Sequence, residues 1–186
     1  MSMSINIQKI VEMCKKQKRL DLLLDPDTMQ QWISDGYAMY PLLGLPMLTE
    51  ENIRAMYALP EGVRVEVKDM HEAFSTADVE PHEKPVFYEK IQLQPCIESV
   101  ITLRTSRGVV FIRGKHLKPL EAGENGETQL YERVSRSGNL YIAAKQGMML
   151  EAIIMPMQNV LGADWLDDMQ RLLADLRQTF EREEKK

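Results

Sequence analysis

Apolar side chains recur at helical spacing near the start of the chain, where Ile7, Ile10, Val11 and Cys14 occupy positions i, i+3, i+4 and i+7. This spacing predicts a short amphipathic helix with Ser4 as its N-cap. Short apolar runs follow at residues 20–24, 29–33 and 37–40, separated by turn residues. We expect these runs to form a three-stranded meander.

A second helix is predicted after Thr49, because this residue can cap the helix and two acidic residues follow it in the first turn. Its buried face would consist of Ile53, Met56 and Tyr57. Residues 63–68 then alternate between valine and charged side chains, which is typical of a half-buried strand.

The second half of the chain is richer in predicted strands, with one helical turn at residues 115–120. The strands are expected at residues 100–103, 109–112, 129–134, 140–144 and 148–155. A long amphipathic helix is predicted at the C-terminal end, with Asp164 as its N-cap. We expect its apolar stripe to belong to the core, with a partner-binding surface as the alternative. The stripe consists of Trp165, Leu166, Met169, Leu172, Leu173, Leu176 and Phe180.

Together these patterns predict an α+β fold, with antiparallel sheets built from a meander and hairpins, flanking helices and the long C-terminal helix. Residues 1–68 would form a unit of helix, meander and helix. The periodicity disappears at residues 69–95, which we interpret as an irregular linker or excursion. Residues 96–186 would form a β-rich unit with the terminal helix, and the two units either make one domain or fold separately.

Composition places the chain among ordinary globular proteins, since 44% of its 186 residues are hydrophobic and 27% are charged. No apolar run reaches the roughly 20 residues that span a bilayer, and the N-terminus lacks a secretory pattern. We therefore expect a soluble cytoplasmic protein without membrane contact. Cys14 and Cys96 have no nearby cysteine partner, so neither a disulfide framework nor a zinc site is predicted.

Catalytic motifs are missing from the sequence: there is no nucleophile elbow, zinc-binding helix motif, phosphate loop or dinucleotide-binding turn. The general bases available near neutral pH are His71, His82 and His116. His71 and His82 stand in the irregular segment, where a metal site is a weaker interpretation than solvated loop residues. We expect no cofactor, no metal and no enzymatic activity, with an unrecognised enzyme as the third hypothesis.

Two groups of residues are candidate binding sites. The stretch from residue 104 to residue 118 contains no acid, although the chain has a net charge of −5. Its basic side chains could contact phosphates by charge, or form a solvated face; they are Arg104, Arg107, Arg113, Lys115 and Lys118. A second group, Trp32, Tyr37 and Tyr40, could anchor a protein partner, although aromatic residues more often belong to a core.

Two segments of the sequence, residues 24–42 and residues 130–156, resemble a family of small proteins of bacterial prophages and mobile elements. This resemblance implies a phage context and assigns no activity. Residues 110–120, together with residues 140–145 and 150–155, look like the strand, helix and strands of one repeat of a DNA sliding clamp.

The leading hypothesis is a non-enzymatic binding or adaptor protein whose partner is another protein, with a homo-oligomer as a further possibility. The alternative is a clamp-like or other DNA-associated accessory factor that uses its basic face on duplex DNA.

Overall fold

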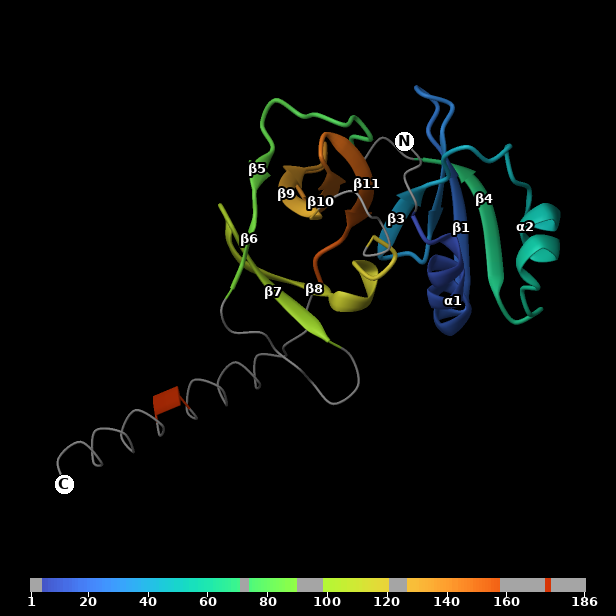
Figure 1. The fold of residues 1–186 in the computed structure, drawn as a ribbon, viewed down its shortest axis with the longest axis horizontal. Helices are drawn as coiled ribbons and strands as arrows, with labels where there is room; N and C mark the ends of the chain where they lie inside the picture. Colours follow the sequence, from blue (N-terminus) through green and yellow to red (C-terminus); the bar gives the residue numbers. More distant parts are fainter. Residues whose placement is uncertain (1–4, 71–73, 90–98, 121–126, 158–172, 175–186) are drawn as a thin grey trace. The chain divides into compact units, whose positions relative to one another are not determined.

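The structure is a computed structural model that describes residues 5–70, 74–89, 99–120, 127–157 and 173–174 (Figure 1). The chain divides into two units, Met1–Pro156 and Met157–Lys186. In the second unit Leu173 and Ala174 are helical, and the rest of the predicted C-terminal helix lies outside the described residues.

The two helices described in the first unit each begin after a residue whose side chain caps the first turn. Helix α1 (Ile7–Gln17) is capped by Asn6, whose side chain accepts a hydrogen bond from the Lys9 backbone at 3.0 Å. The cap is thus Asn6 rather than Ser4, which lies outside the described residues. Helix α2 (Glu50–Tyr57) begins after Thr49, as the sequence predicts, and the Thr49 hydroxyl accepts from the Asn52 backbone at 3.2 Å.

The strands in the described ranges of the first unit form two sheets. In the eight-stranded main sheet the order is β4 (Arg64–Asp69), β1 (Arg19–Leu24), β2 (Gln31–Ser34), β3 (Ala38–Pro41), β11 (Met149–Ile154), β10 (Leu140–Gln146), β9 (Gln129–Val134) and β5 (Lys84–Pro85). In the small sheet the order is β6 (Phe87–Tyr88), β7 (Val100–Thr105) and β8 (Gly108–Arg113). A 3-10 turn, η1 (Gly114–His116), follows β8.

The predicted combination of helices with mostly antiparallel sheets is confirmed. One pairing differs from the expected antiparallel arrangement, because β4 runs parallel to β1. The chain between β3 and β4 contains α2, and a helical crossover of this kind returns the next strand in the parallel direction. The described part of residues 69–95 contains β5 and β6, which pair with β9 and β7.

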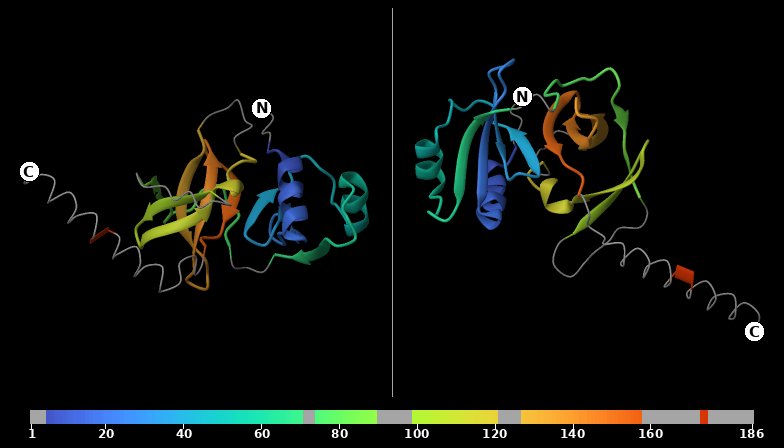
Figure 2. Two further views of the ribbon diagram at one scale, coloured as in Figure 1. Left: turned by 90° about the horizontal axis from the view of Figure 1, so that it is seen from below. Right: turned by 180° about the vertical axis from the view of Figure 1, so that it is seen from behind.

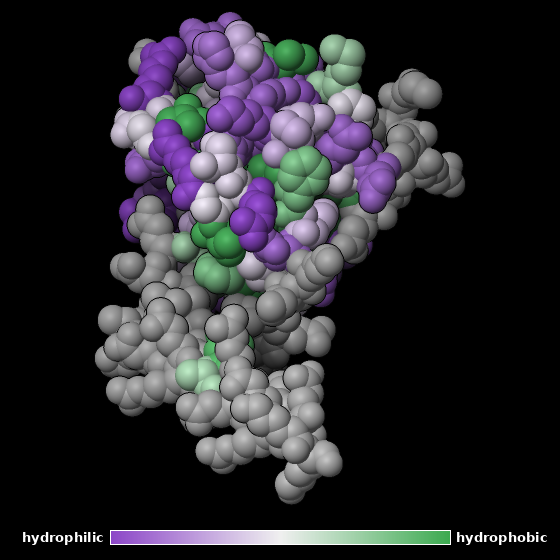
Figure 3. Space-filling view, turned by 90° about the vertical axis from the view of Figure 1, so that its left-hand side faces the viewer, coloured by the Kyte–Doolittle hydropathy of each residue, from purple (hydrophilic) through white to green (hydrophobic). Residues whose placement is uncertain are grey.

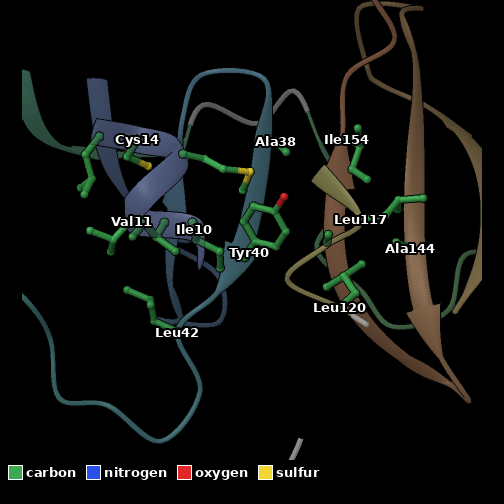
Figure 4. Packing of buried hydrophobic residues seen from close by; sticks show 14 of the residues in the cluster. Ile10, Val11, Cys14, Ala38, Tyr40, Leu42, Leu117, Leu120, Ala144 and Ile154 are labelled. Carbon is green, nitrogen blue, oxygen red and sulfur yellow. The ribbon is translucent and has the colours of Figure 1, made fainter. Parts of the chain in front are cut away.

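The first face of the main sheet carries the larger hydrophobic core. Helix α1 packs against β1 and β2 on this face (Figure 2). The Tyr40 ring lies between the α1 residues and Leu117 and Leu120 of the segment after β8 (Figure 4). Its hydroxyl donates to the His116 carbonyl at 2.8 Å, so the core joins the N-terminal strands to the chain after β8.

The second face of the main sheet carries a smaller apolar cluster. Its buried members are Trp32, Met39, Met70, Tyr141, Ala143, Leu150 and Ile153. Phe74 packs on this cluster, with its ring edge-on to Tyr141 at a centroid distance of 5.2 Å. Chain from the irregular segment therefore covers part of the second face.

Within the described ranges no helix has the length and apolar character needed to span a bilayer.

Candidate functional site

The five predicted phosphate-binding residues lie along β7, β8 and the turns next to them. Arg107 is in the β7–β8 turn and Arg113 is at the opposite end of β8, so the length of that strand separates them. Arg104, on β7, forms an ion pair with Glu89. Lys115 lies in η1 and Lys118 follows it. The structure thus places these cations along a hairpin and its extension, with an acid among them.

The outer face of the small sheet has an exposed cross-strand row. Phe87, Arg104 and Val109 are register partners across β6, β7 and β8. Phe87 is 65% exposed and Val109 is 47% exposed, whereas Leu103 on the inner face is buried. In the space-filling view of the side on which β5, β6 and β7 lie, hydrophobic side chains stand among hydrophilic ones (Figure 3). The row combines apolar contact area with charge.

Strand β8 is the last strand of the small sheet among the described residues. The Gly114 backbone donates to the Ser99 carbonyl at 2.8 Å, which fixes the alternation of hydrogen-bonded pairs along the hairpin. In this alternation Val110 and Ile112 bond to β7, while the backbone groups of Val109 and Phe111 point to the other side. An edge of this kind can pair with another extended chain.

The three aromatic candidates are separated by burial. Tyr40 is buried in the larger core and Trp32 in the second-face cluster, so both are core residues, which the sequence analysis gave as the alternative to a partner anchor. Tyr37 is 45% exposed, and the guanidinium of Arg113 lies 4.3 Å from the centroid of its ring. The structure therefore brings together one residue from each predicted group, Tyr37 and Arg113, as a cation–π pair.

A buried polar group joins η1 to the β2–β3 turn. His116 Nε2 lies 3.1 Å from Asp35 Oδ2, and both side chains are buried. Burial raises the pKa of Asp35, but the His116 hydrogen bond and charge and the Tyr37 and Ala38 backbone N–H groups outweigh it and hold that pKa below its usual value.

Nearby, burial raises the pKa of the Cys14 thiol far above its usual value. This thiol donates to the Ser34 carbonyl at 3.6 Å. Since a thiolate is the nucleophilic form of cysteine, Cys14 is unsuited to attack a substrate at neutral pH. The Asp35–His116 pair is likewise enclosed by the core, so its arrangement favours a structural role.

A pocket of about 590 Å³ opens on the second face, between the β1–β2 loop, residues 74–83 and the β9–β10 hairpin. Most of its inner polar groups already have protein partners. Asp25 accepts from the hydroxyls of Thr28 and Thr76, and Arg133 donates to Glu83 and to backbone carbonyls. Groups committed in this way offer little to a ligand, because each new contact would replace an existing one. The pocket is a weaker candidate than the β8 edge.

Among the residues with described positions, no three metal-ligating side chains come together. His82 is exposed at the pocket rim, and His71 lies outside the described residues.

Glu151 on β11 is an unmatched buried acid. It is 1% exposed, and its Oε2 has no hydrogen-bond partner among the described residues. Burial raises the pKa of this carboxyl above its usual value. Replacing it with glutamine should raise the free energy of unfolding at pH 7 by about 1 kcal/mol, because the charge is no longer buried.

The folded-state pKa of Glu151 exceeds its unfolded value. The gain in free energy of unfolding of the glutamine variant is therefore present at pH values above the folded-state pKa, and it shrinks as the pH falls through that pKa. Urea unfolding of both proteins at pH 7 and pH 4.5 measures the difference. A glutamine variant that is less stable at pH 7 would mean that the carboxylate has a compensating partner.

None of the protein-family models, curated proteins or solved structures compared with the chain matches it. The prophage and sliding-clamp resemblances stay predictions.

Proposed function

We propose that this protein is a non-enzymatic adaptor that binds an extended segment of another protein, which adds as a further strand to the outer edge of β8. The observation that supports this most directly is the backbone of Val109 and Phe111, whose N–H and C=O groups point away from β7 beside an exposed apolar row. Strand addition obtains its affinity from such backbone groups and its specificity from alternate side chains.

The exposed row gives this edge an apolar contact surface. Val109 is on β8 itself and is 47% exposed, so it would contact the added strand directly, whereas Phe87, 65% exposed, continues the same face on β6, two strands farther from this edge. A strand paired with β8 places every second side chain on the face that carries this row. We therefore infer that the partner segment has apolar side chains at alternate positions.

The local charge favours an acidic segment. Five basic residues and no acid occur between Arg104 and Lys118, in a chain whose net charge is −5. Arg107 is exposed at the hairpin turn, at one end of the outer edge of β8. Glutamate or aspartate at the end of the partner segment that lies next to Arg107 would complement this charge.

The same cations are the basis of the DNA-associated alternative. Their spacing along a strand, the Arg104–Glu89 ion pair and the packing of Arg113 on Tyr37 favour protein recognition over a row of phosphate contacts. Retention of the protein on duplex DNA is the result that would support this alternative.

Binding can be measured by fluorescence anisotropy with a labelled ten-residue peptide that alternates valine and threonine and carries a glutamate at each end. Val109→Pro should weaken binding about tenfold or more, because proline lacks the N–H that bonds to the added strand. Proline is tolerated at sheet edges, so the hairpin should persist. Val109→Thr is the matched control, since it keeps the backbone donor and the branched side chain, and it should bind almost as the wild type does.

An N-methylated version of the peptide tests the same contact without changing the protein, and it should not bind. Equal binding of the methylated and unmethylated peptides would exclude strand addition. Retention of the wild type on duplex DNA at low salt, lost in a double variant carrying Arg107→Glu and Lys115→Glu and kept in Val109→Pro, would favour the phosphate-binding alternative instead.

A further inference from the structure

Residues 74–83, which we name the strap, cross the second face of the main sheet without regular secondary structure. Its contacts to the sheet and the neighbouring loop are specific. The Ser75 backbone donates to the Tyr141 hydroxyl at 3.1 Å, and the Leu150 backbone donates to Asp78 Oδ1 at 2.8 Å. Thr76 donates to Asp25 at 2.5 Å. These bonds tie the strap to β10, β11 and the end of β1.

One carboxylate at the end of the strap carries the strongest of these contacts. Glu83 Oε2 accepts from Arg133 at 2.8 Å and 2.5 Å, and Glu83 Oε1 accepts from Lys145 at 2.6 Å. Arg133 and Lys145 are both buried. Burial raises the pKa of Glu83, but its hydrogen bonds to these two cations outweigh that effect and lower it. We name these three residues the latch.

Arg133 also donates hydrogen bonds to the backbone of the strap. Its guanidinium donates to the Ala77 carbonyl at 2.7 Å and to the Asp78 carbonyl at 3.1 Å. A single buried arginine on β9 thereby binds both the middle of the strap and its end. Charged hydrogen bonds in such a group depend on one another, so the loss of one partner weakens the rest.

Hydrophobic burial contributes little to holding the strap. Of its apolar side chains, Phe74 packs on the second-face cluster, whereas Ala77 is exposed and Val79 is 53% exposed. A segment held by polar contacts with few apolar ones belongs to the class that opens below the free energy of global unfolding.

We propose that the strap is a detachable cover, and that the latch sets how often it opens while the sheet beneath stays folded. The pocket on the second face takes one of its walls from the strap, so this wall is lost when the strap opens. Any molecule that fills the closed pocket therefore also holds the strap shut, by mass action.

The test is hydrogen exchange of the strap amides in the full chain. Glu83→Gln should raise exchange at Ser75 and Ala77 about tenfold or more, while the amides that pair β10 with β11 exchange at the wild-type rate. Glu80→Gln is the matched control, because Glu80 accepts a hydrogen bond from Ser75 within the strap and, among the described residues, makes none to the sheet. It should change exchange at Ala77 by less than about twofold.

The wild type gives a second readout that does not depend on a variant that folds. In low concentrations of urea, the strap amides should exchange with a weaker urea dependence than the β10 amides, because opening the strap exposes less surface than unfolding. The same urea dependence for both sets, or strap exchange unchanged by Glu83→Gln, would overturn the proposal.

Discussion

Replacing Asp35 with alanine is expected to lower the free energy of unfolding by about 3–5 kcal/mol, the usual loss when one member of a buried polar pair is removed. Asp35 Oδ2 contacts His116 at 3.1 Å, and Oδ1 accepts from the Tyr37 and Ala38 backbones at 2.9 Å and 3.0 Å. Alanine leaves the imidazole and both N–H groups buried without their acceptor. Urea unfolding followed by tryptophan fluorescence measures the loss.

Two further variants complete the test, one as a control at an exposed acid and one that separates charge from hydrogen bonding at Asp35. Asp27→Ala removes an exposed acid from a neighbouring turn and should change stability by about 0.5 kcal/mol or less. Asp35→Asn keeps the shape and one acceptor oxygen. If asparagine restores most of the stability, hydrogen bonding is sufficient; if it does not, the negative charge is required. A loss below about 1 kcal/mol in the alanine variant would contradict the structural role of the pair.

Ile154→Ala is expected to lower the free energy of unfolding by about 2–5 kcal/mol. Ile154 is completely buried and belongs to the larger core, opposite Ala38 of β3 (Figure 4). The main sheet is continuous at this point through two register pairs, Ile153 with Met39 and Ile154 with Ala38. A cavity here weakens both the core and the junction between β3 and β11, and thermal unfolding measured by circular dichroism should detect it.

Val134→Ala provides the comparison for this junction, because Val134 is also a branched apolar residue on a strand of the main sheet but is 48% exposed. Its expected loss is about 0.5 kcal/mol. Similar losses in the two variants would mean that burial at the β3–β11 junction contributes nothing beyond ordinary strand packing.

Elements determined by neighbouring residues could be predicted from the sequence. The Thr49 cap, the meander of β1 to β3 and the hairpin of β7 and β8 depend on caps, turn residues and alternation that a short window contains. The parallel pairing of β4 with β1 could not be predicted in this way. It depends on where the α2 crossover returns the chain, which is a property of the whole fold.

The strap and its latch gave no usable signal in the sequence. Glu83 stands in a segment rich in acids and prolines, which by itself favours an irregular exposed chain. Arg133 and Lys145 occur on predicted strands as ordinary charged residues, yet they are buried because Glu83 neutralises them. A buried charge is recognisable only when its partner is known, and here the partner is distant in sequence.

The basic stretch stood out in the sequence because it contains no acid, and its role in binding stays a prediction. Its position on an edge strand could not be predicted, because it depends on the strand order β6, β7, β8. The sequence could not separate Tyr37 from Trp32 and Tyr40, because exposure at the β2–β3 turn depends on what packs against each ring.

The pairing of β3 with β11 also bears on how the chain folds as it is made. Met39 lies near the start of the chain and Ile153 lies near the end of the first unit, so the main sheet cannot be completed until β11 has left the ribosome. Until then β3 presents an unpaired edge to other nascent chains. Contacts between such distant residues slow folding, so chaperones that shield extended segments should improve the yield of this protein more than agents that stabilise helices.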